Sequence, residues 1–102
     1  MLYPQTIGID VSKDYLDFAL YTSNHQVKYL GRVNNEIEAL LRFLSELAAT
    51  YDIGNTLFCL ETTGMYTHPF LLVGVELGLR VWLQSALEIS QSLGLKRSKN
   101  DV

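Results

Sequence analysis

The sequence has only one cysteine and two prolines among its 102 residues, and it has no long apolar run. A single cysteine, Cys59, excludes an internal disulfide, so we expect a reducing compartment and a thiol that serves as a small core side chain. No stretch approaches the roughly 18 apolar residues of a membrane-spanning helix. The amino terminus also lacks the basic-then-apolar layout of a signal peptide. The sequence therefore predicts a cytoplasmic protein without a membrane partner.

An excess of basic residues is also lacking. Eight Lys and Arg stand against eleven Asp and Glu, which gives a net charge of −3. A domain that coats nucleic acid usually carries a basic excess, so the composition disfavours that class. It leaves open an acidic centre that acts on nucleic acid through bound metal. With 48% hydrophobic residues, the chain has the material for one globular domain rather than a disordered segment.

Hydrophobic patterns predict five strands and three helices. The expected strands cover residues 6–11, 15–21, 26–33, 56–60 and 79–83, and the expected helices begin near residues 35, 67 and 86. The first strand is a short apolar run that ends in an acid, and the second and third alternate on either side of a turn. The three together are typical of an antiparallel meander. Each later strand follows a helix, and such crossovers cover the faces of a sheet. The order βββαβαβα therefore predicts an α/β fold with a mixed five-stranded sheet and helices on its faces.

Local signals add four predictions to this order. Asn35 is expected to cap the first helix. Pro69 and Gly78 are expected to mark the start and the end of the second helix. The continuous apolar run at 56–60 favours a strand buried on both faces. Trp82 lies in a buried strand pattern, so we expect it in the core.

Two acidic residues close predicted strands. Asp10 ends the first strand and Glu61 ends the fourth. Ligands gather at the carboxyl ends of parallel strands, and neighbouring strands lie about 4.8 Å apart. Two carboxylates so placed repel each other unless a cation lies between them, and hard oxygen ligands suit Mg²⁺ or Mn²⁺. The pair predicts a divalent metal site, although an acid such as Asp10 after a strand is also typical of a turn or a cap.

The carboxyl-terminal run combines basic residues with one more acid, Asp101. Lys96, Arg97 and Lys99 are typical of a solvated basic tail, but the same residues could contact phosphate groups. The residues alone leave both interpretations open. The two histidines are far apart in the sequence and too few for a zinc site.

Three short motifs carry a resemblance to a known family. They are IGIDVSK at residues 7–13, LETTGMY at residues 60–66 and KND at residues 99–101. In this order and spacing they resemble the amino-terminal domain of the DEDD insertion-sequence transposases, a group that includes the Piv-type DNA invertases. The resemblance covers nearly the whole chain. It implies an RNase H-like fold similar to that of the RuvC Holliday-junction resolvase, and the βββαβαβα order agrees with that fold independently.

The resemblance also implies a reaction and a set of site residues. Asp10, Glu61 and Asp101 match the family's first three catalytic acids, which hold two Mg²⁺ or Mn²⁺ ions. The implied reaction is cleavage and strand transfer of DNA by two-metal phosphodiester chemistry. Four basic residues would contact the DNA backbone without reading its sequence. They are Lys13, Lys96, Arg97 and Lys99.

The family's pattern extends past the last residue of this sequence. Its fourth acid would follow Asp101 by about three residues, on the same helical face. We therefore expect residues 1–102 to be an RNase H-like catalytic domain that is truncated before the fourth acid and is inactive by itself. The partners implied by the resemblance are DNA, a guide RNA as in some relatives, the family's carboxyl-terminal domain, and further copies of the chain in a homo-oligomer.

Two other functions are compatible with parts of the sequence. Actin-like and sugar-kinase ATP-binding domains also end their first strand in an acid. They need a glycine next to that acid so that the backbone can approach phosphate, and residues 11–14 offer none. The other alternative is a non-catalytic interaction domain whose acids only cap turns. Nucleotide binding would support the former, and a failure to bind divalent metal would support the latter.

Overall fold

The computed structural model describes residues 5–61 and 64–84. Its strands are β1 (Gln5–Val11), β2 (Tyr15–Thr22), β3 (Val27–Asn34), β4 (Thr56–Glu61) and β5 (Arg80–Gln84). Its α-helices are α1 (Ile37–Leu47) and α2 (His68–Leu77), and short 3₁₀ turns, η1 (Ile53–Asn55) and η2 (Gly64–Thr67), precede β4 and α2. The predicted element order is confirmed as far as β5. The helix predicted from residue 86 lies outside the described residues.

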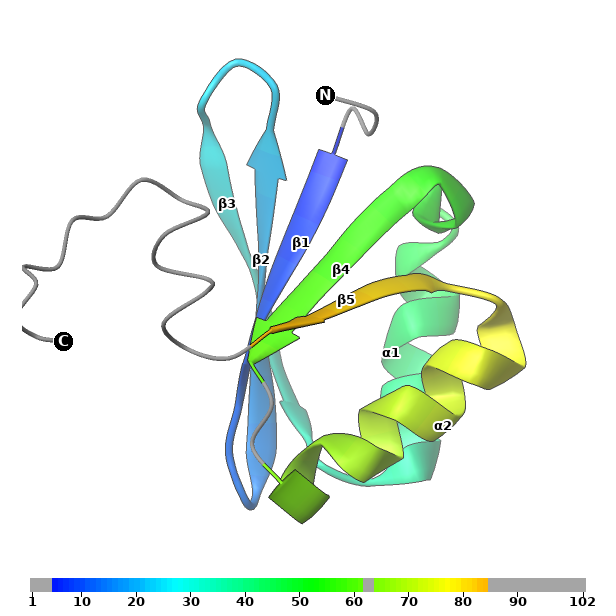
Figure 1. Ribbon diagram of the computed structural model, residues 1–102. Coiled ribbons are helices and arrows are strands. Elements are labelled where there is room, and N and C mark those ends of the chain that lie inside the picture. The colour runs from blue at the N-terminus through cyan, green and yellow to red at the C-terminus, as the bar shows by residue number, and fades with distance from the viewer. Residues whose placement is uncertain (1–4, 62–63, 85–102) are drawn as a thin grey trace, which may run out of the picture.

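The five strands form one mixed sheet in the order β3-β2-β1-β4-β5. β1 and β2 pair antiparallel, as do β2 and β3. β1 and β4 pair parallel, and so do β4 and β5. The meander and the two crossovers therefore meet at β1 and β4 in the middle of the sheet, as Figure 1 shows. This arrangement confirms the predicted mixed α/β sheet.

Both described helices pack on the same face of the sheet (Figure 1). β1, β2 and β4 alternate, so that every second side chain of their central residues enters the space under the helices. Phe70 of α2 joins the layers, with its ring centroid 5.9 Å from that of Phe58 and 6.3 Å from that of Phe18. The main buried residues from the strands are Ile7, Ile9, Leu16, Phe18, Leu20, Phe58 and Leu60, and those from the helices are Leu40, Leu44, Leu47, Phe70 and Val73. Among the described residues, the core is therefore one layer between the sheet and the two helices.

The one-sided packing overturns two local predictions. In β4 only Thr56, Phe58 and Leu60 are buried, so the prediction of a strand buried on both faces is wrong. Trp82 was expected in the core, yet 39% of its surface is exposed and it lines the other face. The physical reason is that α1 and α2 cover one face only, so that neighbouring residues of one apolar run meet different environments.

The helix boundaries follow their sequence signals unevenly. α2 has Pro69 in its first turn and ends at Gly78, whose φ of 69° is the left-handed conformation that glycine adopts easily, so both predictions are confirmed. α1 instead has Glu36 at its N-cap, without a side-chain cap hydrogen bond. The prediction that Asn35 caps this helix is wrong, because its side chain bonds to two other segments. Neither helix in the described ranges has the length and apolarity to cross a membrane.

Candidate active site

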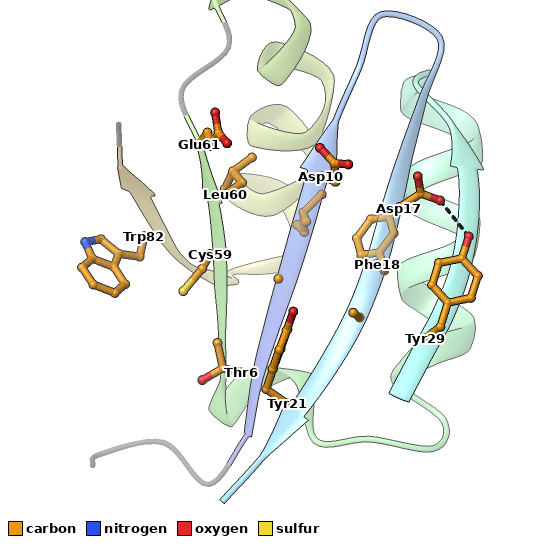
Figure 2. A pocket seen from close by; sticks show the side chains of 13 residues that line it. Thr6, Asp10, Asp17, Phe18, Tyr21, Tyr29, Cys59, Leu60, Glu61 and Trp82 are labelled. Atoms are coloured by element: carbon orange, nitrogen blue, oxygen red, sulfur yellow. Dashed lines mark hydrogen bonds between the residues drawn. The ribbon is translucent and has the colours of Figure 1, made fainter. Parts of the chain in front are cut away.

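Asp10 and Glu61 lie at the same edge of the sheet. The parallel register of β1 and β4 ends with Ile9 opposite Leu60, and each acid is the next residue of its strand. Because side chains alternate, both acids project to the face opposite the helices. Both residues are exposed. Figure 2 shows their carboxyl groups at the ends of the two neighbouring strands.

The chemistry of this pair fits a hard divalent cation. The carboxylates of Asp10 and Glu61 have no hydrogen-bond or ion-pair partner among residues 5–61 and 64–84, so their oxygens are available as ligands. Carboxylate oxygens are the donors that Mg²⁺ and Mn²⁺ prefer. Within the described ranges, no group of three His, Cys, Asp or Glu side chains is arranged to hold a metal. The described residues thus include two of the three carboxylates that the sequence predicts at a metal site.

The other predicted site residues are divided between two parts of the chain. Lys13 is exposed in the turn that follows Asp10, at the same end of β1. Asp101 and the three basic residues Lys96, Arg97 and Lys99 lie outside the described residues. The structure therefore brings together Asp10, Glu61 and the turn that carries Lys13, and it tests nothing about the remaining four.

Asn35 connects the two loops that follow the acids. Its side-chain amide donates hydrogen bonds to the carbonyl oxygens of Ser12 and Tyr66, both at 2.9 Å. Its backbone N–H donates to the carbonyl oxygen of Asp14 at 2.9 Å. The turn after Asp10 and the η2 turn beyond Glu61 are thus held to one side chain. Sequence reasoning missed this role because an asparagine before a helix has the same pattern as a cap.

A third acid, Asp17, lies beside the pair but has partners of its own. In the antiparallel register it is directly opposite Asp10. Its carboxylate accepts hydrogen bonds from Tyr29 Oη at 2.7 Å, from Arg32 Nε at 3.0 Å and from Arg32 Nη2 at 3.1 Å. The Arg32 guanidinium, followed by the Tyr29 hydroxyl, lowers the pKa of Asp17 and keeps it ionised. Figure 2 shows this carboxylate turned toward β3.

Arg32 is itself held by the same cluster. Its guanidinium carbon lies 3.7 Å from the ring centroid of Tyr15, a cation–π distance. The positive charge of Arg32 therefore balances Asp17 and does not balance the charges of Asp10 and Glu61. The alternation of β2 places Asp17 on the face opposite the helices, which we call the open face. No sequence signal shows that Arg32 reaches it.

The open face is hollowed beside the acids. A hollow of about 470 Å³ has Asp10 and Glu61 at one end, and its floor includes Gly8 and Cys59. A Cβ atom at Gly8 would lie 3.1 Å from the ring of Tyr21, so a side chain at this position would crowd that ring. Cys59 is half-buried on this face rather than in the core, which corrects the sequence prediction. Partial burial raises the pKa of its thiol.

Comparison with solved structures identifies the fold. The chain is similar to T. thermophilus RuvC, solved in complex with a Holliday junction substrate, with a TM-score of 0.59 and 11% sequence identity. The match covers 98% of this chain and 75% of that chain. No family model and no curated protein matches the sequence. The likeness confirms the predicted RuvC-type, RNase H-like fold.

Proposed function

We propose that this chain is the catalytic domain of a DEDD-type DNA transposase or recombinase, which cleaves phosphodiester bonds and transfers DNA strands. The observation that carries the proposal is the placement of Asp10 and Glu61 at the ends of two neighbouring parallel strands. The RuvC-type fold supports it, and the similar RuvC structure was solved with a branched DNA substrate. The three sequence motifs favour a transposase within this fold.

The proposed centre uses three carboxylates of this chain. Asp10 would help to hold both metal ions, and Glu61 and Asp101 would each help to hold one of them. Two Mg²⁺ or Mn²⁺ ions, when bound, activate the attacking oxygen and stabilise the leaving oxygen of a phosphodiester. Asn35 holds the loops that follow Asp10 and Glu61, so it is a positioning residue for both.

Basic residues of the chain would bind the DNA backbone. Lys13 is exposed beside Asp10, which suits contact with a phosphate group close to the reacting bond. Lys96, Arg97 and Lys99 would add further phosphate contacts, which position DNA without reading its sequence. The guide RNA, the carboxyl-terminal domain and the homo-oligomer implied by the resemblance stay predictions.

The β1–β2 turn disfavours the ATP-binding alternative. Both the backbone N–H and the hydroxyl of Ser12 donate to the carbonyl oxygen of Tyr15, at 3.0 and 2.8 Å. The turn contains no glycine and no residue with positive φ. A phosphate-binding loop needs backbone N–H groups that converge on the ligand, for which glycine is the usual residue. We therefore expect no nucleotide binding.

Thermal unfolding with and without Mn²⁺ tests the metal centre. Binding at one hundred times the dissociation constant would stabilise the native chain by about 2.7 kcal/mol. We expect this stabilisation in the unmodified protein and its loss in Asp10→Asn and Glu61→Gln. Glu46→Gln is the matched control, because Glu46 is an exposed acid on α1. An equal shift in all four proteins would overturn the metal centre, and no shift in any of them would favour the non-catalytic interaction domain.

Fluorescence anisotropy with labelled duplex DNA tests the basic residues. With a net charge of −3, the chain should bind DNA weakly, without sequence preference and with a steep dependence on salt. Neutralising Lys96, Arg97 and Lys99 together should abolish binding, and Lys13→Ala should reduce it. If the triple variant still bound DNA tightly, with an affinity that does not change with salt, the proposed contacts would be contradicted.

A further inference from the structure

The floor of the hollow on the open face is a row of small residues that crosses the middle of the sheet. Ala19, Gly8 and Cys59 are register partners on β2, β1 and β4. The same row continues to Tyr29, opposite Ala19 on β3, and to Trp82, opposite Cys59 on β5. Four strand spacings separate these two aromatic residues, which is about 19 Å along the row. The floor is therefore low over three strands and has an aromatic residue at each side.

The rings that line the hollow are exposed. The exposed fractions are 45% for Tyr21, 62% for Tyr29 and 39% for Trp82. Figure 2 shows these residues on three different strands around the hollow. The rings of Phe18 and Phe58, which enter the core, are fully buried instead. Exposed aromatic rings on an open sheet are the surface on which single-stranded nucleic acids stack their bases. The hollow therefore fits a flat aromatic ligand.

The charges around the hollow restrict the ligand further. None of the described residues that line it is Lys or Arg. Asp17, Asp10 and Glu61 lie two residues further along their strands than the floor, which is about 7 Å away. An anionic group would be repelled by these carboxylates, whereas a neutral ring would not. A nucleotide satisfies both conditions, because its base is neutral and its phosphate can lie at the acids with a divalent cation between them.

We propose that the hollow binds unpaired bases of single-stranded DNA next to the phosphodiester held at Asp10 and Glu61. The proposal rests on the proposed function, because the same metal centre holds the phosphate. The bases stack on Tyr21 and Trp82. The hydroxyl of Tyr29 donates to Asp17 at 2.7 Å, so this ring is fixed and limits the hollow on the β3 side.

This arrangement selects the form of DNA rather than its sequence. Every base has a flat face, so stacking tolerates all four. In an intact duplex the bases are already stacked and paired, and they reach a pocket on a protein surface only if they are extruded. The chain should therefore prefer single-stranded or locally unpaired DNA to intact duplex.

The fluorescence of Trp82 measures this binding directly, because it is the only tryptophan of the chain. Titration with a short oligothymidylate strand in Mg²⁺ should quench the emission to saturation. A strand of equal length that lacks the bases carries the same phosphates and should not quench it. Intact duplex should need about a tenfold higher concentration. Equal quenching by the strand without bases, or stronger quenching by an RNA strand of matched sequence, would overturn the proposal.

Variants of Tyr21 separate stacking from the shape of the surface. Tyr21→Leu keeps an apolar side chain without an aromatic ring and should weaken oligothymidylate binding about tenfold. Tyr21→Phe is the matched control, since it keeps the ring and should bind as the unmodified chain does. The residue is 45% exposed, so circular dichroism should show the unchanged fold in both. Equal affinities of the two variants would remove the stacking role.

Alkylation of Cys59 provides a second way to block the hollow. It is the only cysteine of the chain, so iodoacetamide adds one group to the floor at a known position. The modified protein, identified by mass spectrometry, should bind oligothymidylate at least fivefold more weakly. Unchanged affinity after complete modification would show that the bases do not enter the hollow.

Asp10→Asn distinguishes a failure of this proposal from a failure of the proposed function. If Mn²⁺ stabilises the unmodified chain but not Asp10→Asn, and oligothymidylate does not quench Trp82, the metal centre stands and base binding is wrong. If oligothymidylate quenches Trp82 with the expected loss in Tyr21→Leu, but Mn²⁺ stabilises neither protein, base binding stands and the catalytic proposal is wrong.

Discussion

The two faces of the sheet differ in side-chain chemistry although the same five strands build both. The face under α1 and α2 is formed by apolar residues such as Phe18, Phe58 and Leu60, which are fully buried or nearly so. The opposite face carries acids, tyrosines, Cys59 and Trp82, all of them partly or largely exposed. Since successive side chains of a strand point to opposite faces, one strand can contribute both to the stability of the fold and to the candidate site.

This difference separates the residues that hold the fold from those available for chemistry. Ile9 and Leu60 are buried, and the residue that follows each of them is an exposed acid. The buried side chains fix the parallel register of β1 and β4, and that register places Asp10 beside Glu61. The candidate site should therefore tolerate substitutions that the covered face does not.

Neighbouring residues of β4 offer the largest expected contrast. Phe58→Ala removes a fully buried ring and should lower the free energy of unfolding by about 3–5 kcal/mol. Cys59→Ala, on the open face, should lower it by about 1 kcal/mol or less. Urea unfolding of the two variants measures both values. Equal losses would show that the two faces are equally important for stability.

Asn35, between β3 and α1, should have the next largest effect. Asn35→Ala removes the hydrogen bonds to Ser12 and Tyr66, so we expect a loss of about 1–2 kcal/mol. The affinity for Mn²⁺ should also fall, because the loops beyond Asp10 and Glu61 are no longer tied together. Urea unfolding and Mn²⁺ titration measure the two effects. A loss of stability with unchanged Mn²⁺ affinity would remove the positioning role.

The Asp17 cluster should stabilise the fold near neutral pH and lose this contribution in acid. In the folded chain the pKa of Asp17 is lowered below 3.8, mainly by the hydrogen bonds from Arg32 and then by the one from Tyr29. The stabilisation is therefore complete above pH 3.8 and is lost as the pH falls through the lower folded value. Near neutral pH, Asp17→Asn should cost less than about 1 kcal/mol, because the ion pair is exposed.

Chemical unfolding of the unmodified chain and Asp17→Asn between pH 6 and pH 2 measures this contribution. The unmodified chain should lose more stability in acid than the variant does. Tyr29→Phe removes only the hydrogen bond from the Tyr29 hydroxyl to Asp17, so this variant should lose an intermediate amount of stability in acid. Identical pH dependence in all three proteins would show that the open-face cluster does not contribute to stability.

The smallest effect concerns the reactivity of Cys59. Partial burial raises the pKa of its thiol, so less of it is thiolate at neutral pH than in an unfolded chain. We expect iodoacetamide to modify the native protein more slowly than the urea-unfolded protein, with no large change in stability afterwards. Mass spectrometry of timed samples measures the rate. Equal rates would mean that the open face is solvated as fully as an unfolded chain.

Local patterns predicted the elements of this fold well. The alternation in β1 to β3, the helical spacing in α1 and the Pro69 and Gly78 signals of α2 depend on side chains close together in the chain. The carboxyl-end positions of Asp10 and Glu61 came from the same patterns. The spacing of apolar residues and the residue types at turns are local properties, so the sequence alone was enough to predict these elements. The mixed sheet followed from the element order, because crossover rules leave few arrangements.

Only the tertiary structure decided which residues share an environment. The apolar run of β4 does not reveal that α1 and α2 cover only one of its sides. Cys59 and Trp82, its partner on β5, were therefore wrongly predicted to be core residues. Asn35 has the sequence signal of a cap, but its amide donates instead to the carbonyl oxygens of Ser12 and Tyr66, which are distant in the sequence. The ion pair between Asp17 and Arg32 depends on the pairing of β2 with β3. Such contacts join residues far apart in the chain, and only the packed fold brings them together.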